Sequence, residues 1–452
     1  MATEQLAAWA QALRFHDLPP QVVEAAVRSF YNWAGCAIGG AQHAAAVIAR
    51  NSLSPFAGAP TSSVLGCQEP TDAQSAALFN GISSHVHDYD DTHLDTIIHP
   101  SGPVASALLA AAEWKAPVDG RDFILALVAG IEAECKAGLA VWPDHYNIGW
   151  HITSTAGSIG AAVAVGKLLG LSVEQMQWAI GIAATQVTGL REQFGSMTKS
   201  FHPGRAAQNG LVAAVLASNG YDSSLQSLEA KRGWANVVSA TNDVDALMQG
   251  LGRTWEIEKN SFKPFPCGIV IHPIIDGCIQ VRQMFATGQH EKDAAADVSA
   301  IQKVEVSVHA LVLELTGKHS PKTGLEGKFS VFHGAAVGLL YGKATPAQYE
   351  DAVVQDPVVV QLRKKVHATI DDALRPDEAH VKVVFNDGSV QEKHIGHAVG
   401  SLQLPMTDIQ LEEKFLDQCN PVLGDKKAKE ASQALWGLRE VGNIADLTSL
   451  LR

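Results

Sequence analysis

Residues 380–395 read HVKVVFNDGSVQEKHI, and the pattern of this stretch decides the fold class. Apolar and polar residues alternate on both sides of an Asn-Asp-Gly sequence at 386–388, which favours a two-stranded hairpin. An earlier stretch, VEVSVHALVLEL at 304–315, also alternates and predicts another strand. The chain is therefore not purely helical.

Outside these strands the sequence has the periodicity of helices. Before residue 256, successive segments rich in Ala, Gly, Leu and Val predict helices with apolar residues on most of their faces. Helical patterns return after residue 397. The sequence thus predicts a mainly α fold with an α+β insertion. We expect a helical domain built from residues 1–258 and 397–452, and a smaller α+β lid domain from residues 259–396.

The composition limits the classes of function. The chain has 452 residues, of which 46% are hydrophobic and 18% charged, and its net charge is −13. These values are typical of a soluble globular protein, and the absence of a Lys/Arg-rich run argues against nucleic acid and anionic membranes as partners. No signal-peptide pattern and no apolar run of about 18 residues is present, so we expect a cytoplasmic protein.

Four polar stretches lie between the predicted helices, each where a loop leads into a helix. They are HVHDYDDTHLDTIIHPSG (85–102), DHYNIGWHITSTAGSIG (144–160), REQFGSMTKSFHPGRAAQNG (191–210) and NSFKPFPCGIVIHPIIDG (260–277). Each residue in them has an ordinary structural alternative, such as a helix cap or a solvated surface charge. Loops that gather at one rim of a helical core form a pocket, so together the stretches predict a site.

The first stretch concentrates His and Asp, which raises the question of a metal. Zinc sites use three or four ligands at fixed spacing, as in H-E-x-x-H. His85 and His87 would point apart on a helix, and Asp90-Asp91 does not match a calcium loop. A metallohydrolase with an ion among His85, His87 and His93 is therefore a minor alternative to a metal-free site.

The metal-free interpretation rests on the basic residues of the other stretches. Lys199, Lys263 and Arg205, with several histidines, could bind a substrate that carries two or three carboxylates. Removing a proton next to a carboxylate requires a positioned base, and cations that stabilise the enediolate. The sequence has no Gly-rich nucleotide loop after a strand and no G-x-S-x-G elbow. We therefore expect no cofactor; a non-catalytic protein that binds small acids is an alternative.

At these stretches the sequence resembles the MmgE/PrpD family. This family contains cofactor-free enzymes, among them 2-methylcitrate dehydratases, cis-aconitate decarboxylases and an iminodisuccinate epimerase. The motifs that carry the resemblance are HVHDYDDTHLDTIIHPSG, GWHITSTAG, MTKSFHPGRAAQNG and KPFPCG, in this order. The resemblance covers essentially the whole chain, and it implies an active site between the helical domain and the lid, in a homodimer that binds a small polycarboxylate.

The resemblance also implies which residues form the site. Its motifs place these side chains there: Asp88, Thr92, His99, His151, Lys199 and Lys263. From the third stretch we add His202 and Arg205 as substrate-binding residues. We expect the catalytic residues to be His151, Lys199, Lys263, His333 and Tyr146.

One position bears on the type of reaction. In KFSVFHGAA, His333 stands where dehydratase and decarboxylase members have Tyr. Epimerisation needs two bases on opposite faces of the substrate, and His333 with His151 would supply that pair. Tyr146, which lies shortly before His151, is an alternative acid partner. We therefore expect an epimerase acting on an iminodisuccinate-like substrate, slightly ahead of a dehydratase or a decarboxylase.

Overall fold

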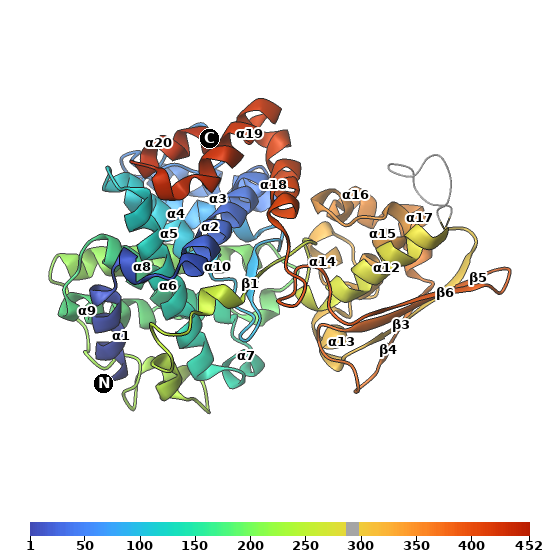
Figure 1. The fold of residues 1–452 in the computed structure, drawn as a ribbon, viewed down its shortest axis with the longest axis horizontal. Coiled ribbons are helices and arrows are strands. Elements are labelled where there is room, and N and C mark those ends of the chain that lie inside the picture. Colours follow the sequence, from blue (N-terminus) through green and yellow to red (C-terminus); the bar gives the residue numbers. More distant parts are fainter. Residues whose placement is uncertain (286–297) are drawn as a thin grey trace.

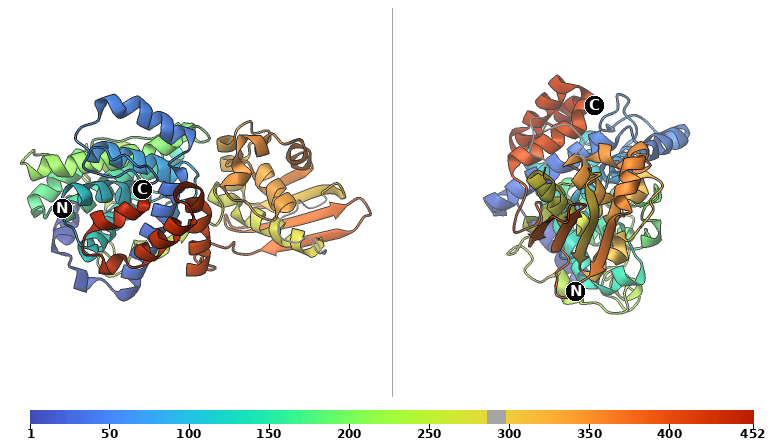
Figure 2. Two further views of the ribbon diagram at one scale, coloured as in Figure 1. Left: turned by 90° about the horizontal axis from the view of Figure 1, so that it is seen from above. Right: turned by 90° about the vertical axis from the view of Figure 1, so that its right-hand side faces the viewer.

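The structure is a computed structural model that describes residues 1–285 and 298–452. It is mainly helical, with a small mixed sheet in the C-terminal region, as the sequence predicts. Figure 1 shows the large helical part with both termini on it, and a smaller part that carries the sheet beside it. The same division appears in the left-hand view of Figure 2, from above. Among the described residues, none of the helices combines the length and the apolarity needed to cross a membrane.

The helical part is formed by most of the first half of the chain. Its helices are α1 (Ala2–Ala12), α2 (Pro20–Gly40), α3 (Ala44–Leu53), α4 (Ala73–His85), α5 (Ser101–Trp114), α6 (Gly120–Val141), α7 (Asp144–Ile148), α8 (Ile152–Leu168), α9 (Val173–Ala184), α10 (Thr198–Ser218) and α11 (Trp234–Val238). Side chains cap several of them at their N-termini. Asp72 accepts hydrogen bonds from the first turn of α4, and Ser172 forms a capping box with Gln175 of α9.

Small residues allow the central helices to approach closely. At the crossing of α4 and α10, a Cβ on Gly81 would lie 2.4 Å from the Cα of Gly204. At the crossing of α6 and α8, a Cβ on Gly130 would lie 2.6 Å from the Cβ of Ala164. Only glycine fits at such distances. The first crossing matters for function, because α4 ends and α10 begins with polar residues singled out above.

The C-terminal end of the chain returns to the helical part. It forms α18 (Asp408–Leu423), α19 (Asp425–Trp436) and α20 (Ile444–Thr448). The ring of Tyr31 in α2 lies 4.8 Å from Phe415 and 4.3 Å from Trp436, measured between ring centroids. One hydrophobic core therefore contains buried side chains from residues 6–262 and from residues 406–451.

The smaller part contains a four-stranded sheet with its own core. The strand order is β4 (Val366–Ile370), β3 (Ile301–Val308), β5 (Ala379–Phe385) and β6 (Val390–Ile395), with β3 parallel to β4 and antiparallel to β5. The predicted hairpin is confirmed as β5 and β6, and Gly388 in its turn has a φ of 83°. Helices α12 (His272–Phe285) and α15 (Val331–Tyr341) pack together beside the sheet (Figure 1). The second core lies within residues 267–385.

The predicted strand at 304–315 is only half correct. Strand β3 ends at Val308, and α13 (Ala310–Thr316) follows it. His309 starts this helix, because its Nδ1 accepts a hydrogen bond from the backbone N–H of Leu311 at 3.1 Å. Short apolar runs fit the periodicity of a strand and that of a helix, and here the N-cap at His309 favours the helix. The remaining short helices of this part are α14 (Gly324–Gly327), α16 (Asp351–Val354) and α17 (Pro357–Arg363). Of the predicted lid at 259–396, residues 286–297 lie outside the described residues.

We predict that Gly81→Ala destabilises the protein, because the added methyl group would overlap the backbone of α10. The expected loss in the free energy of unfolding is about 1–3 kcal/mol, typical of overpacking. Thermal and urea unfolding would measure it. Gly442→Ala is the matched control, since its Cβ would meet no atom within 4 Å. Equal stability of the two variants would contradict the close crossing.

Candidate active site

A short antiparallel ribbon joins the first and the last of the polar stretches. Strand β1 (Asp91–His93) pairs with β2 (Asn260–Phe262), with Asp91 opposite Phe262. In an antiparallel pair, the residues before one strand lie beside the residues after the other. This register brings Lys263 to Asp88. The Lys263 Nζ lies 2.8 Å from Asp88 Oδ1 and also donates to the Asp88 backbone oxygen at 3.2 Å.

Helix α10 supplies a second ammonium group to the same carboxylate. Lys199 lies in its first turn, and its Nζ is 2.8 Å from Asp88 Oδ1. All three side chains are buried. Burial alone would raise the pKa of Asp88, but Lys199 and Lys263 hold it well below its usual value. Two cations thus share one ionised carboxylate, so this group of three side chains carries one net positive charge.

The backbone at Asp88 is unusual. Its φ is 52°, in the left-handed region that residues other than glycine seldom adopt. Such a conformation persists only where the surrounding contacts determine it, and it is common at functional sites. Here the two lysines hold the carboxylate, and Lys263 also holds the backbone oxygen.

Three buried histidines surround this ion group. The ring centroid of His85 lies 4.9 Å from that of His99 and 5.7 Å from that of His151. The Nδ1 atom of each ring has a hydrogen-bond partner. That of His85 lies 2.7 Å from Asp90 Oδ2, and that of His99 lies 2.7 Å from the backbone oxygen of Asp91. That of His151 lies 2.9 Å from His202 Nδ1. Burial lowers the pKa of His99 to about 3 and that of His151 well below its usual value. Both rings are therefore neutral near pH 7 and available as bases.

These groups enclose a cavity of about 40 Å³. Its polar lining is Asp88, His99, Tyr146, His151, Lys199, Lys263 and Thr316. Phe194 from the helical part and Phe329 from the smaller part also line it, and their rings stack at 5.7 Å. Sites for small molecules usually enclose about 300–1,000 Å³. The cavity in this structure is therefore smaller than a typical small-molecule site.

Most of the residues predicted from the sequence come together here. Six of them line the cavity, and two more stand directly behind its histidines. Thr92 is buried with its Oγ1 3.2 Å from His99 Nδ1, and His202 holds His151. Burial raises the pKa of Tyr146 to about 12, so its phenol is protonated and can donate a proton.

Two predicted residues lie outside the cavity. Arg205 is exposed and its guanidinium donates to Gln208 Oε1 at 2.6 Å, because this position of α10 faces away from Lys199. His333 lies in the first turn of α15, where its Nε2 donates to the backbone oxygen of Gln348 at 3.0 Å. The expectation that His333 faces His151 across a substrate is therefore wrong.

Sequence reasoning missed Lys328. Its Nζ donates to the backbone oxygens of His87 at 2.8 Å and Pro266 at 2.9 Å, so this residue of the smaller part ties two loops of the site together. Burial lowers its pKa to about 7. Lys328 directly precedes FSVFHG, the start of a predicted apolar helix. A lysine next to such a helix was the signal by which the sequence could have identified it.

Lys414 in α18 was missed as well. Its Nζ donates to the backbone oxygens of Tyr89 at 2.6 Å and Lys263 at 2.8 Å, and burial lowers its pKa to about 8. Lys414 therefore connects the same two segments as Lys328. In an amphipathic helix such a residue is indistinguishable from a surface lysine, so the sequence carried no signal for it.

The metal alternative does not fit the observed geometry. The three histidines suggested for it do not converge: the His87 ring packs on His43, and His93 Nε2 bonds to Glu256. Among the described residues, donor atoms of His85, His99 and His151 do lie within 4.8 Å of one another. The ammonium groups of Lys199 and Lys263 adjoin them, however. Donor atoms of His85, Asp88, Asp90 and His99 form a second such group, but both lysines already bind the carboxylate of Asp88.

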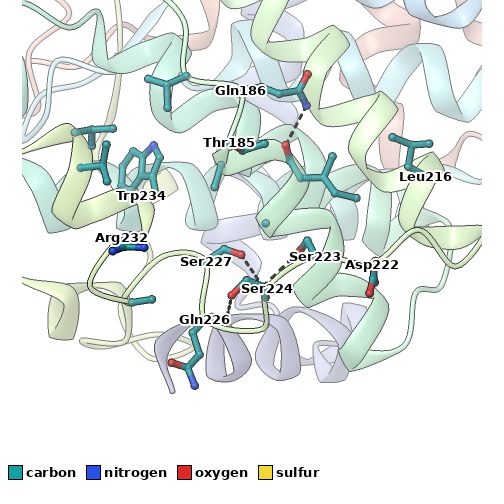
Figure 3. Close-up of a pocket in the computed structure, with 18 of the residues that line it drawn as sticks. Thr185, Gln186, Leu216, Asp222, Ser223, Ser224, Gln226, Ser227, Arg232 and Trp234 are labelled. Carbon is teal, nitrogen blue, oxygen red and sulfur yellow. Dashed lines mark hydrogen bonds between the residues drawn. The ribbon is translucent and has the colours of Figure 1, made fainter.

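A larger hollow of about 820 Å³ lies on the outer side of the helical part (Figure 3). It is bounded by the C-terminal end of α9, by Leu216 of α10, and by the loop at 221–234. Figure 3 shows Ser223, Ser224 and Ser227 along this loop, with Arg232 and Trp234 to their left. Residues of the four polar stretches do not line it. The smaller cavity is the better active-site candidate, because the acid–base groups and cations are there.

The sequence was compared with known families and proteins. The model of the MmgE/PrpD N-terminal domain matches residues 4–247, and that of the MmgE/PrpD C-terminal domain matches residues 265–438. A cis-aconitate decarboxylase of Aspergillus terreus is 27% identical over 99% of this chain and 95% of its own length. The human cis-aconitate decarboxylase is 26% identical over 83% and 79%. A 2-methylcitrate dehydratase of Salmonella typhimurium is 26% identical over 74% and 73%.

We predict that Asp88→Asn destabilises the protein far more than Lys199→Met. The first change leaves two buried ammonium groups without a counter-charge, which costs about 3–5 kcal/mol. The second leaves the pair of Asp88 and Lys263 intact, and the cost is less than about 2 kcal/mol. Urea unfolding of both variants would measure the difference. Similar losses would show that Asp88 is not the shared partner of the two lysines.

Proposed function

The chain belongs to the MmgE/PrpD family, and from this we propose that it is a lyase acting on a polycarboxylic acid. The observation that carries the proposal is the placement of Lys199 and Lys263 on one carboxylate oxygen of Asp88, each at 2.8 Å, beside neutral histidines. A net positive cavity recognises carboxylates. The relatives named as decarboxylase and dehydratase support the lyase class.

Both lyase reactions place an electron pair on a carbon next to a carboxylate. In decarboxylation the C–C bond breaks, carbon dioxide leaves, and the carbon accepts a proton. In dehydration a base removes the proton and the hydroxyl group leaves as water. We propose that Lys199 and Lys263 stabilise the developing enediolate, that one of the buried histidines transfers the proton at carbon, and that Tyr146 acts as an acid.

We rank the epimerase interpretation second. It depended on His333 as a second base, and that ring is bonded to the backbone of Gln348 in the smaller part. The decarboxylases match this chain over a larger share than the dehydratase does. We therefore propose an unsaturated tricarboxylate similar to cis-aconitate as the first substrate to test, followed by a methylcitrate-like acid.

The activity test uses a panel of polycarboxylic acids in D₂O, followed by proton NMR. Decarboxylation and dehydration each give a new product, whereas epimerisation incorporates deuterium and loses neither carbon dioxide nor water. We predict that Lys199→Met lowers kcat by a factor of at least about 10³, since it removes a charge that acts on the transition state.

Two further variants complete this test. Lys426→Met, at a side chain that is 92% exposed, should keep wild-type turnover, and His333→Gln should keep at least a third of it. Binding without turnover of any acid would identify the non-catalytic alternative. Loss of activity in the His333 variant would restore the two-base interpretation.

We also propose that the protein is a homodimer in which a second copy covers the hollow of Figure 3. Apolar side chains are exposed around it: Val237 is 70% exposed, Tyr221 61% and Leu216 36%. Such side chains favour association. Sedimentation velocity should show a dimer that Val237→Glu shifts toward the monomer. A wild-type monomer at micromolar concentration would contradict this proposal.

A further inference from the structure

His85 is the last residue of α4, and the site described so far gives it no role. Its side chain is buried, and its Nδ1 lies 2.7 Å from Asp90 Oδ2. Its other ring nitrogen, Nε2, is buried without a hydrogen-bond partner among the described residues. Leaving a buried polar atom unpaired costs about 1–3 kcal/mol. Such an atom beside a reactive cavity calls for a functional explanation.

His85 lines a recess that continues the main cavity. The recess and the main cavity share Asp88, Lys199 and Phe329. His85 lines only the recess, whereas His99 and Tyr146 line only the main cavity. The remaining polar walls of the recess are Ser196, Ser200 and Lys328. A substrate bound to Lys199 would therefore contact His85 through the recess and the other acid–base groups through the main cavity.

Asp90 distinguishes His85 from the other two histidines. An ionised carboxylate only accepts, so His85 carries its proton on Nδ1 and keeps a lone pair on Nε2. Burial disfavours ionised Asp90, but His85 and His99 hold the pKa of this carboxyl below its usual value. When Nε2 takes a proton, the imidazolium stays bonded to a carboxylate.

Within the described part of the chain, the other two rings have no carboxylate within hydrogen-bond distance, although Asp88 Oδ1 lies 4.0 Å from His99 Nε2. His99 Nδ1 bonds to the backbone oxygen of Asp91, with Asp90 Oδ1 more distant at 3.7 Å. His151 Nδ1 bonds to the imidazole of His202. A neutral partner stabilises an imidazolium less than a carboxylate does. Of the three rings, that of His85 is the one with a carboxylate at hydrogen-bond distance.

We propose that His85 is a proton-transfer residue of this lyase, and that its Nε2 exchanges a proton with the substrate carbon next to the carboxylate held by Lys199. This inference rests on the proposed function. In dehydration, Nε2 takes the proton, the C–H electron pair forms the double bond, and the hydroxyl leaves as water with a proton from Tyr146. In decarboxylation, His85 first takes a proton from water at Nε2; carbon dioxide then leaves with the C–C bond broken, the electron pair stays on carbon, and the imidazolium gives its Nε2 proton to that carbon and returns to the neutral ring.

The first experiment compares His85→Gln with His43→Gln on the acid that the wild-type enzyme turns over. His43 is the matched control, because it is a partly buried histidine that lines neither the main cavity nor the recess. We expect His85→Gln to lower kcat by about 10²–10³-fold, as for loss of a general acid or base, with KM within threefold. His43→Gln should stay within twofold in both. Circular dichroism and thermal unfolding check that the variants are folded.

The second variant, Asp90→Asn, tests the role of the carboxylate. The groups that face His85 are Asp88, Asp90, Lys199, His99, His151 and His202. Burial lowers the pKa of His85 and Asp90 raises it, so the variant should move the His85 limb of the pH–kcat profile to lower pH. The direction is the same for a base and for an acid. A purely structural role of Asp90 would change the amplitude without moving this limb.

The outcomes separate the two proposals. Wild-type protein without turnover of any polycarboxylate would overturn the proposed function, and this inference with it. Wild-type turnover that His85→Gln retains within threefold would overturn the inference alone. If His85→Gln does not fold, nitrogen-15 NMR of wild-type protein labelled at histidine replaces it. A protonated Nδ1 with an unprotonated Nε2 at His85 is the expected result, and the reverse tautomer would overturn the inference.

Discussion

The site depends on one interaction, the ion group in which the carboxylate of Asp88 holds the ammonium groups of Lys199 and Lys263. These residues come from the loop after α4, the first turn of α10, and the segment after β2. Burying any one of the charges alone would be costly. Each charged side chain is stable in the interior because the other two are present. The three segments that carry them therefore have to pack together.

Two further lysines extend this arrangement without joining the ion group. Lys328 and Lys414 each donate to backbone oxygens on both the loop before β1 and the segment that begins at Lys263. The protein as a whole is acidic, with a net charge of −13. Buried cations therefore gather in the part of the molecule where a polycarboxylate would bind. Local charge, rather than net charge, determines what such a site attracts.

The fold and most of the cavity could be predicted from the sequence, but the details that depend on tertiary contact could not. The Asn-Asp-Gly hairpin and the alternation around it are local signals, and they were sufficient for the sheet. The pattern at 304–315 was ambiguous, because only the cap at His309 ends the strand. Motifs marked Lys199 and Lys263, whereas the orientation of His333 depends on the carbonyl of Gln348, which is distant in sequence. For His85, the sequence suggested a metal ligand, and the neighbouring Asp90 gives it a different environment.

The stacked rings of Phe194 and Phe329 have a consequence for selectivity. They come from different parts of the molecule, and the Lys199 ammonium lies 5.2 and 5.4 Å from their centroids. Parting the rings removes two cation–π contacts from that ammonium at once. A ligand would compensate for this loss only if it placed an anionic group next to Lys199. Separation of the two rings on binding would therefore favour acids over neutral molecules before any chemical step.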